Sequence, residues 1–151
     1  MEKIFLLADD DMDDTLLFCE ALETVDETVT CYCATHGQEA LEILAKEKLP
    51  DLIFLDINMP RMNGWECLKR IKQNTAYANI PILVYSTSSH PKDINTALDL
   101  GALCFFSKPN NFDDLKNILE VIVKHVDKDL IQAIGKFNHI TSQKVFSCSD
   151  E

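Results

Sequence analysis

The sequence predicts an α/β fold, a doubly wound, five-stranded parallel sheet with helices on both faces. Short apolar segments alternate five times with longer segments in which apolar residues recur at helical spacing, and the connections between them are short. The segment 52–55 is apolar at every position, which is typical of a parallel strand buried on both faces. Right-handed crossovers between such strands leave few arrangements of the sheet.

Five strands are expected, and one of them differs from the others. Residues 29–34 alternate apolar and polar side chains, so we place this strand half exposed at an edge of the sheet. The remaining strands are more continuously apolar. In chain order, the five predicted strands are 3–8, 29–34, 52–55, 80–86 and 103–107.

Five helices follow the strands, each with apolar residues at spacings of three and four. They are expected to begin near Asp13, Gly37, Gly64, Ile94 and Leu115. After Val126 the helical pattern continues weakly to Phe137, so either the fifth helix extends to about Gly135 or a short extra helix packs against the body. Residues 138–151 are polar and Ser-rich and are expected to be frayed. We therefore expect one domain over 1–127 and a C-terminal extension over 128–151 that starts helical, ends in a polar tail and forms no separate output domain.

The charge balance limits the classes of partner. Asp and Glu number 25 against 14 Lys and Arg, a formal net charge of −11, which repels a nucleic-acid backbone. No apolar segment approaches the length of a membrane span, and the amino-terminal apolar segment is too short for a signal peptide. We expect a cytoplasmic protein that binds neither nucleic acid nor membrane.

The six cysteines show no C-x-x-C pair, and most lie in apolar periodic segments. This pattern predicts free, buried thiols in a reducing compartment and does not favour a zinc site. Their positions are 19, 31, 33, 67, 104 and 148.

Polar side chains stand where the predicted strands end. Asp9 and Asp10 follow the first strand, Asp56 follows the third, Ser86 closes the fourth and Lys108 follows the fifth. All carboxyl ends of a parallel sheet lie along one edge, so these groups are expected to converge there. Adjacent carboxylates repel unless a cation lies between them, and Mg²⁺ prefers such oxygen ligands.

A phosphoryl transfer would use each of these groups. Asp56 can act as the nucleophile and form an aspartyl phosphate. The three phosphoryl oxygens then need compensating charge or hydrogen bonds, which Mg²⁺, the Lys108 ammonium and the Ser86 hydroxyl can supply.

With these residues in place, the chain resembles the receiver domains of bacterial two-component response regulators from about Lys3 to Val126. The resemblance implies a flavodoxin-like fold with strand order 2-1-3-4-5. The matching positions are Asp9-Asp10, Leu55-Asp56 with Asn58-Met59-Pro60 and Gly64, Ser86-Thr87, and Lys108-Pro109.

The resemblance also implies roles for single residues. Asp56 would be phosphorylated by a sensor histidine kinase or a histidine phosphotransfer protein. Asp56, Asp10 and the backbone carbonyl of Asn58 would hold Mg²⁺, and Asp9 would contact the ion through water. The family's more common tyrosine is replaced by Phe105.

Ser86 and Lys108 would respond to the phosphoryl group, and Phe105 would change rotamer with them. The resemblance thus implies a signalling protein rather than an enzyme. Its output would be a changed surface on the fourth helix, fifth strand and fifth helix, presented to a downstream protein or to a second copy of the chain.

Two other functions compete with this prediction. Asp11-Met12-Asp13-Asp14-Thr15 matches the D-x-D-x-T string of haloacid-dehalogenase-type phosphatases, which also form an aspartyl phosphate. That string should follow the strand directly, whereas Asp9 and Asp10 intervene here. An unphosphorylated pseudo-receiver that acts as an interaction module is the second alternative, although every acceptor residue is present.

Overall fold

A computed structural model describes residues 2–88, 90–140 and 146–148, and it contains the five predicted strand–helix units together with one further helix and one further strand. The strands are β1 (Ile4–Ala8), β2 (Thr30–Ala34), β3 (Leu52–Leu55), β4 (Ile82–Ser86), β5 (Cys104–Ser107) and β6 (Phe146–Cys148). The helices are α1 (Met12–Val25), α2 (Gly37–Lys46), α3 (Gly64–Gln73), α4 (Pro91–Asp99), α5 (Phe112–His125) and α6 (Leu130–Ile140). None of the helices in the described part of the chain has the length and apolar character needed to span a bilayer.

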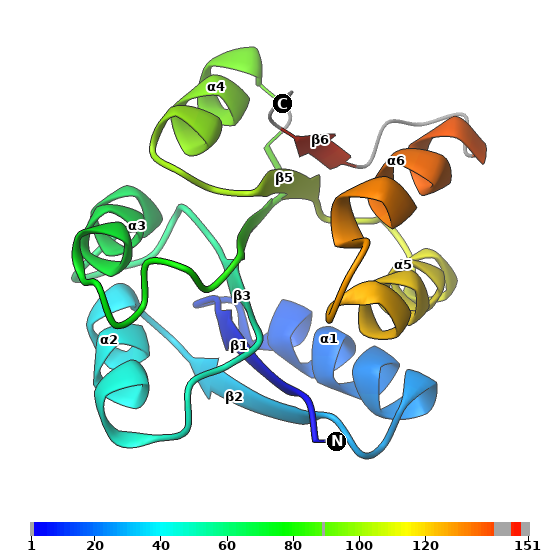
Figure 1. Cartoon of the computed structure of the whole chain (residues 1–151), viewed down its shortest axis with the longest axis horizontal. Coiled ribbons are helices and arrows are strands. Elements are labelled where there is room, and N and C mark those ends of the chain that lie inside the picture. Colours follow the sequence, from blue (N-terminus) through cyan, green and yellow to red (C-terminus); the bar gives the residue numbers. More distant parts are fainter. Residues whose placement is uncertain (1, 89, 141–145, 149–151) are drawn as a thin grey trace.

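The sheet separates two layers of helices. α1 and α5 cover one face, and α2 and α3 cover the other, with α4 beside β5 (Figure 1). The strand order is β2-β1-β3-β4-β5-β6, and the first five strands are parallel, so the expected fold class and the order 2-1-3-4-5 are confirmed. β2 forms one edge and is only half-buried, as its alternating sequence predicts.

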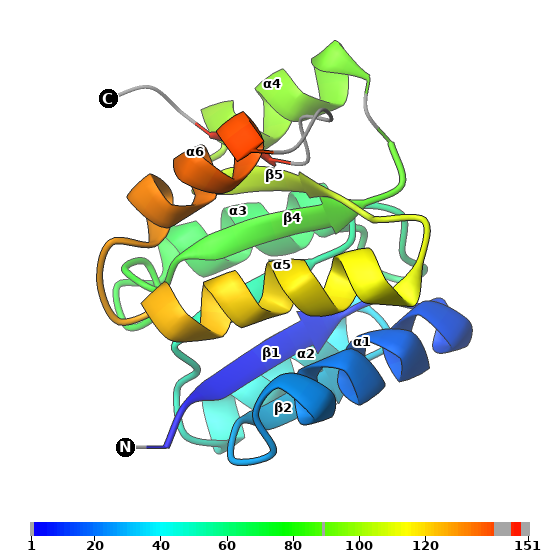
Figure 2. The ribbon, with the colours of Figure 1, turned by 90° about the vertical axis from the view of Figure 1, so that its right-hand side faces the viewer.

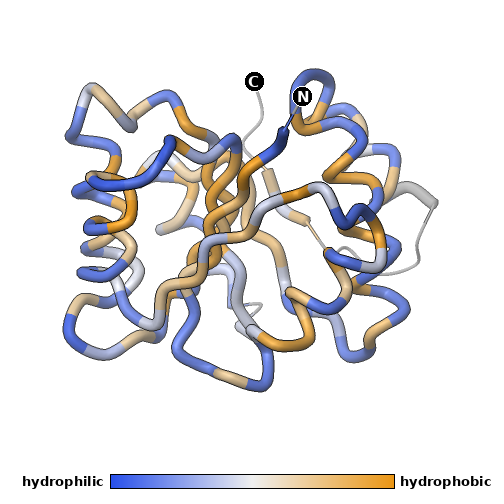
Figure 3. The backbone as a smooth tube through the Cα atoms, turned by 90° about the horizontal axis from the view of Figure 1, so that it is seen from below, coloured by the Kyte–Doolittle hydropathy of each residue, from blue (hydrophilic) through white to orange (hydrophobic). Residues whose placement is uncertain are grey.

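Two apolar cores fill the space between the sheet and its helices. Successive residues of a strand point to opposite faces, so Leu7 packs toward α1 and α5 while Leu6 packs toward α2 and α3. Figure 3 shows the resulting apolar centre, with hydrophilic residues concentrated on the outer surfaces of the helices. The two cores fix the strand register and thereby the positions of the strand ends.

The sixth strand corrects the expectation of a frayed, five-stranded end. β6 pairs antiparallel with β5, and Phe146 lies opposite Phe106. The two rings stack with centroids 4.7 Å apart, and Phe146 is 1% exposed. Burial of this one aromatic side chain, together with the strand pairing, orders a segment whose sequence is otherwise polar. The expected tail residues 141–145 and 149–151 lie outside the described part of the chain.

The expected helical start of the extension is present as α6, which runs beside α5 (Figure 2). Its buried residues Leu130 and Ile134 join the core between α5 and the sheet. The extension therefore adds to the core of the receiver unit and does not build a core of its own.

The prediction that all cysteines are free is wrong for two of them. Cys104 of β5 and Cys148 of β6 form a disulfide across the antiparallel pair. The sequence offers no clue to this pairing because the two residues are 44 positions apart. The other four cysteines are free, but only Cys67 is buried as predicted: Cys19 and Cys31 are half-buried, and Cys33 is exposed because it lies on the edge strand β2.

Candidate functional site

The acidic residues after β1 and β3 are brought together by the register of these two strands. Ala8 pairs with Leu55, so Asp9 and Asp56 follow at adjacent positions on one edge of the sheet. The Asp56 amide donates to the Ala8 carbonyl and the Asp9 amide to the Ala34 carbonyl, each at 2.9 Å. Backbone hydrogen bonds thus fix where both side chains begin.

Three carboxylates gather at this edge. Asp9, Asp10 and Asp56 each offer an oxygen, and these atoms lie within 4.8 Å of one another. Asp9 and Asp56 are buried and Asp10 is exposed, so the cluster opens to solvent on one side. Hard oxygen ligands, two of them desolvated, fit Mg²⁺ or Mn²⁺, which bind through one or two carboxylates and keep water in the remaining positions.

The electrostatics of Asp56 fit the same conclusion. Desolvation raises the pKa of this carboxyl to about 6, and the charge of Asp9 acts in the same direction. The nearby Lys108 ammonium opposes the shift without cancelling it. A carboxylate in this position is more easily kept charged when a divalent cation binds beside it.

Lys108 reaches the cluster from the end of β5. Its Nζ donates to Asp9 Oδ2 at 2.7 Å and to Asp14 Oδ2 at 2.8 Å, and it lies 3.8 Å from Asp56 Oδ2. Burial alone would lower the pKa of this lysine, but the hydrogen bonds to Asp14 and Asp9 outweigh it and raise the pKa. Lys108 is therefore a fixed positive charge beside Asp56.

Of the other predicted residues, Asn58 contacts Asp56, Ser86 ends the neighbouring strand β4, and Phe105 lies deeper within the sheet. Ser86 is buried at the end of β4, and its Oγ accepts the Ser88 amide at 3.1 Å. The Asn58 amide donates to Asp56 Oδ1 at 3.3 Å. Phe105 lies one strand further along, buried in the core on the α4 side of the sheet.

Two acids of the amino-terminal cluster have contacts that the sequence did not predict. Asp11 is the N-cap of α1, where its side chain accepts the Asp14 amide at 3.0 Å. Asp14 lies in the first turn of α1, and its carboxylate also accepts a hydrogen bond from the Lys108 ammonium at 2.8 Å. The high density of aspartates after β1 indicates that some of them make specific contacts. No pattern in the sequence shows that Asp11 caps α1 or that Asp14 binds Lys108.

Gly64 begins α3 where the helix passes against the Asp56 backbone. A Cβ on this residue would overlap the carbonyl oxygen of Asp56. The Gly64 amide donates to the Ile57 carbonyl at 3.1 Å, which ties the helix start to the loop after β3. Only glycine permits this close approach, so Gly64 helps to set the position of Asp56.

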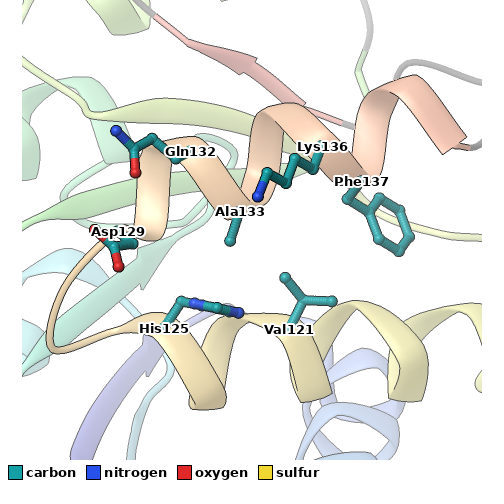
Figure 4. A pocket seen from close by; sticks show the side chains of 7 residues that line it. All are labelled: Val121, His125, Asp129, Gln132, Ala133, Lys136 and Phe137. Atoms are coloured by element: carbon teal, nitrogen blue, oxygen red, sulfur yellow. The ribbon is translucent and has the colours of Figure 1, made fainter.

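A hollow of about 290 Å³ lies between α5 and α6, away from the carboxylate edge (Figure 4). None of the predicted site residues lines it. Figure 4 shows His125 and Val121 of α5 facing Ala133 of α6 across it. This hollow is a consequence of the C-terminal extension and is separate from the carboxylate edge.

Comparison with known proteins connects the carboxylate edge to a family. The family model "Response regulator receiver domain" matches residues 5–120. The response regulator Rcp1 of a Synechocystis strain is 31% identical over 80% of this chain and 86% of its own length. Four other curated relatives are longer, and this chain spans 24–52% of their length.

Solved structures agree with the sequence comparison. The Mn²⁺-bound form of Rcp1 matches with a TM-score of 0.71, covering 80% of this chain and 91% of that one at 31% identity. The phosphorylated cyanobacterial phytochrome response regulator RcpA matches with a TM-score of 0.76, covering 82% of this chain and 93% of that one at 32% identity.

Proposed function

This chain belongs to the response regulator receiver domain family, and we propose that Asp56 is the residue that accepts its phosphoryl group. One observation carries the proposal. The Asp56 carboxylate is buried at the end of β3, beside two further carboxylates and 3.8 Å from the Lys108 ammonium. A nucleophile is thus held next to groups that can neutralise an incoming phosphoryl group.

Receiver domains take their phosphoryl group from histidine kinases or phosphotransfer proteins, and we assign that role to the partner of this chain. An Asp56 carboxylate oxygen attacks the phosphorus of a phosphohistidine, and an oxygen–phosphorus bond forms as the nitrogen–phosphorus bond breaks. The leaving imidazole nitrogen keeps the electron pair and takes up a proton. No separate catalytic base is needed because Asp56 attacks as a carboxylate.

Receiver domains bind Mg²⁺ or Mn²⁺ at their acidic pocket, and here we propose Mg²⁺. Asp10, Asp56 and the Asn58 backbone carbonyl would hold the ion directly, and Asp9 would do so through water. When bound, it compensates charge on the phosphoryl oxygens. Lys108 then binds a second phosphoryl oxygen, and the Ser86 hydroxyl donates to the third.

We propose that the output is a changed surface and not a reaction product. Movement of Ser86 and Lys108 toward the phosphoryl group would leave room for Phe105 to change rotamer, and this would bias the face of α4, β5 and α5 toward one of two conformations. A downstream protein or a second copy of the chain would bind that face. Because β6 pairs with β5 and α6 packs on α5, the extension becomes part of this surface.

We further propose that residues 1–127 form the receiver unit and that 128–151 extend it. The end of the family match at residue 120, within α5, supports this division. The shared core of α5 and α6 supports treating the extension as an addition to the receiver rather than a separate output domain.

The intact mass of the protein after incubation with Mg²⁺ and a small acyl phosphate tests the assignment. Wild type should gain one phosphoryl group, and Asp56→Asn should gain none. Asp99→Asn, which changes an exposed carboxylate at the end of α4, is the matched control and should behave as wild type. Chelation of the metal should abolish the gain.

Two outcomes would contradict the proposal. A phosphoryl gain in Asp56→Asn would move the nucleophile to the aspartates after β1. Trp65 follows Gly64 at the start of α3, and its fluorescence can report metal binding. No phosphoryl gain in wild type that binds metal would indicate an interaction module that is not phosphorylated.

A further inference from the structure

A group of three free cysteines lies on the opposite side of β1 from the disulfide, at the other edge of the sheet. Cys31 and Cys33 are two residues apart on β2, so their side chains point to the same face of the strand. That face is covered by α1, which contributes Cys19. The three residues therefore meet because of the strand period and of the packing of α1 on the edge strand.

The sulfur atoms are close enough to share one ion. All three lie within 4.8 Å of one another, and the Sγ atoms of Cys19 and Cys33 are 3.5 Å apart. A metal ion with metal–sulfur distances of about 2.3 Å in a trigonal plane would hold its sulfurs about 4 Å apart. The observed spacing fits this arrangement with only small side-chain movements.

Cysteine binds metal ions as the thiolate. Each of the three cysteines would therefore give up its proton as the ion binds, so the affinity for the ion should rise with pH.

The group is also accessible to an ion from solvent. Cys33 is exposed, and Cys19 and Cys31 line a hollow of about 410 Å³ between α1 and β2. Three of the residues that line this hollow, Glu20, Glu23 and Glu27, are acidic and raise the local concentration of cations. No histidine or carboxylate of the described chain joins the three sulfurs within the same distance, so the ligand set is sulfur only.

From this geometry we propose that Cys19, Cys31 and Cys33 form a binding site for monovalent copper. Thiolate ligands select soft ions such as Cu(I) and Zn²⁺, and structural zinc sites almost always have four protein ligands. Three sulfurs without a fourth ligand favour Cu(I). As each copper–sulfur bond forms, any proton on that sulfur passes to the buffer, and the copper stays monovalent. The ion would join α1 to the edge strand.

Anaerobic titration of the full chain with Cu(I) against a chromophoric copper chelator tests the site. One copper ion should bind per chain, with thiolate-to-copper charge-transfer absorption and three sulfur neighbours in X-ray absorption spectra. Replacing Cys19 or Cys33 by Ser removes a direct ligand, so affinity should fall at least about 100-fold, the upper limit seen for outer-shell changes. Copper should also raise the melting temperature of wild type, because it binds the folded state.

The matched controls are Cys67→Ser, which changes a free buried cysteine elsewhere, and Cys104→Ser with Cys148→Ser, which removes the disulfide. Both should retain wild-type affinity for Cu(I). The proposal is overturned if these controls lose copper as Cys33→Ser does or if no copper is retained. It is also overturned if zinc displaces copper at equal free concentration, or if the cluster forms a Cys19–Cys33 disulfide that excludes the metal.

Discussion

Two regions of this molecule, the carboxylate edge of the sheet and the C-terminal extension beside β5, are stabilised in different ways. At the carboxylate edge, Asp9, Asp56 and Lys108 come from three strand ends and are held by polar contacts. At the β5 side, the extension is held by the stacking of Phe146 on Phe106, by strand pairing and by a disulfide. The first region carries buried charge that costs stability, and the second contributes apolar burial and covalent closure.

This difference explains how a receiver domain can retain a cluster of mutually repelling carboxylates. The fold can tolerate carboxylates that repel each other because packing elsewhere in the protein offsets their cost to the free energy of unfolding. These carboxylates then remain available to bind a cation or accept a phosphoryl group. If this is correct, the effect of a substitution at the carboxylate edge on the free energy of unfolding should depend on metal and pH. The effect of a substitution in β6 should not.

The largest effect is expected from Lys108→Met. The lysine is 8% exposed and pairs with the fully buried Asp9 side chain, so its loss leaves an uncompensated buried carboxylate. The free energy of unfolding without divalent cations should fall by about 3–5 kcal/mol. Urea denaturation measures this, with the exposed Lys69→Met of α3 as the matched control.

Added Mg²⁺ should restore part of the stability that Lys108→Met loses, because a second cation replaces the missing charge. If Lys108→Met lowers the free energy of unfolding equally with and without Mg²⁺, the carboxylate edge does not respond to a cation. It would then not differ from β6 in its dependence on metal.

The next effect is expected from Phe146→Ala at the other region. A fully buried, stacked phenylalanine is lost, and the free energy of unfolding should fall by about 3 kcal/mol, independent of Mg²⁺. The control Ile131→Ala changes an α6 side chain that is 45% exposed, and its effect should stay within about 0.5 kcal/mol. Phosphoryl gain on Asp56 should be unchanged, and a reduced gain would show that the two regions are coupled.

The smallest effect is the pH dependence of Asp56. Its folded pKa of about 6 lies above the ordinary 3.8, so its contribution to stability is present below about pH 4 and is lost as the pH rises through 6. Without divalent cations, Asp56→Asn should therefore become more stable than wild type by about 2–3 kcal/mol at pH 7.5.

Urea denaturation from pH 4 to pH 7.5 checks this, with Asp99→Asn as the variant that should show no such pH-dependent gain. A constant difference between wild type and Asp56→Asn across that range would refute the assigned pKa. Saturating Mg²⁺ should remove or reverse the advantage of Asp56→Asn.

Most of the carboxylate edge could be predicted from the sequence because strand ends are marked locally. An apolar segment ending in an acid or a lysine identifies both the strand and its terminal residue, and parallel topology brings the ends together. Asp9, Asp56 and Lys108 were found in this way. The contact of Lys108 with Asp14 was not, since it depends on the orientation of one long side chain toward a helix start 94 residues away.

The β6 strand and the cysteine contacts could not be predicted for a related reason. Three residues are too few to show a period, and the antiparallel pairing of β6 depends on where α6 delivers the chain. The same limit applies to Cys19, which meets Cys31 and Cys33 only through the packing of α1 on β2. The C-x-C alternation was visible, but no sequence pattern points to the third cysteine.

The pairing of β6 with β5 also changes what the molecule exposes to its neighbours. An unpaired parallel edge strand offers a row of amides and carbonyls to any extended chain, and such edges promote strand addition and aggregation. Here the chain covers the β5 edge with its own strand β6. With only three residues, β6 offers few backbone groups for pairing with another chain. Self-association through edge pairing is therefore expected to be directed to β2, where half-buried and exposed side chains already limit it.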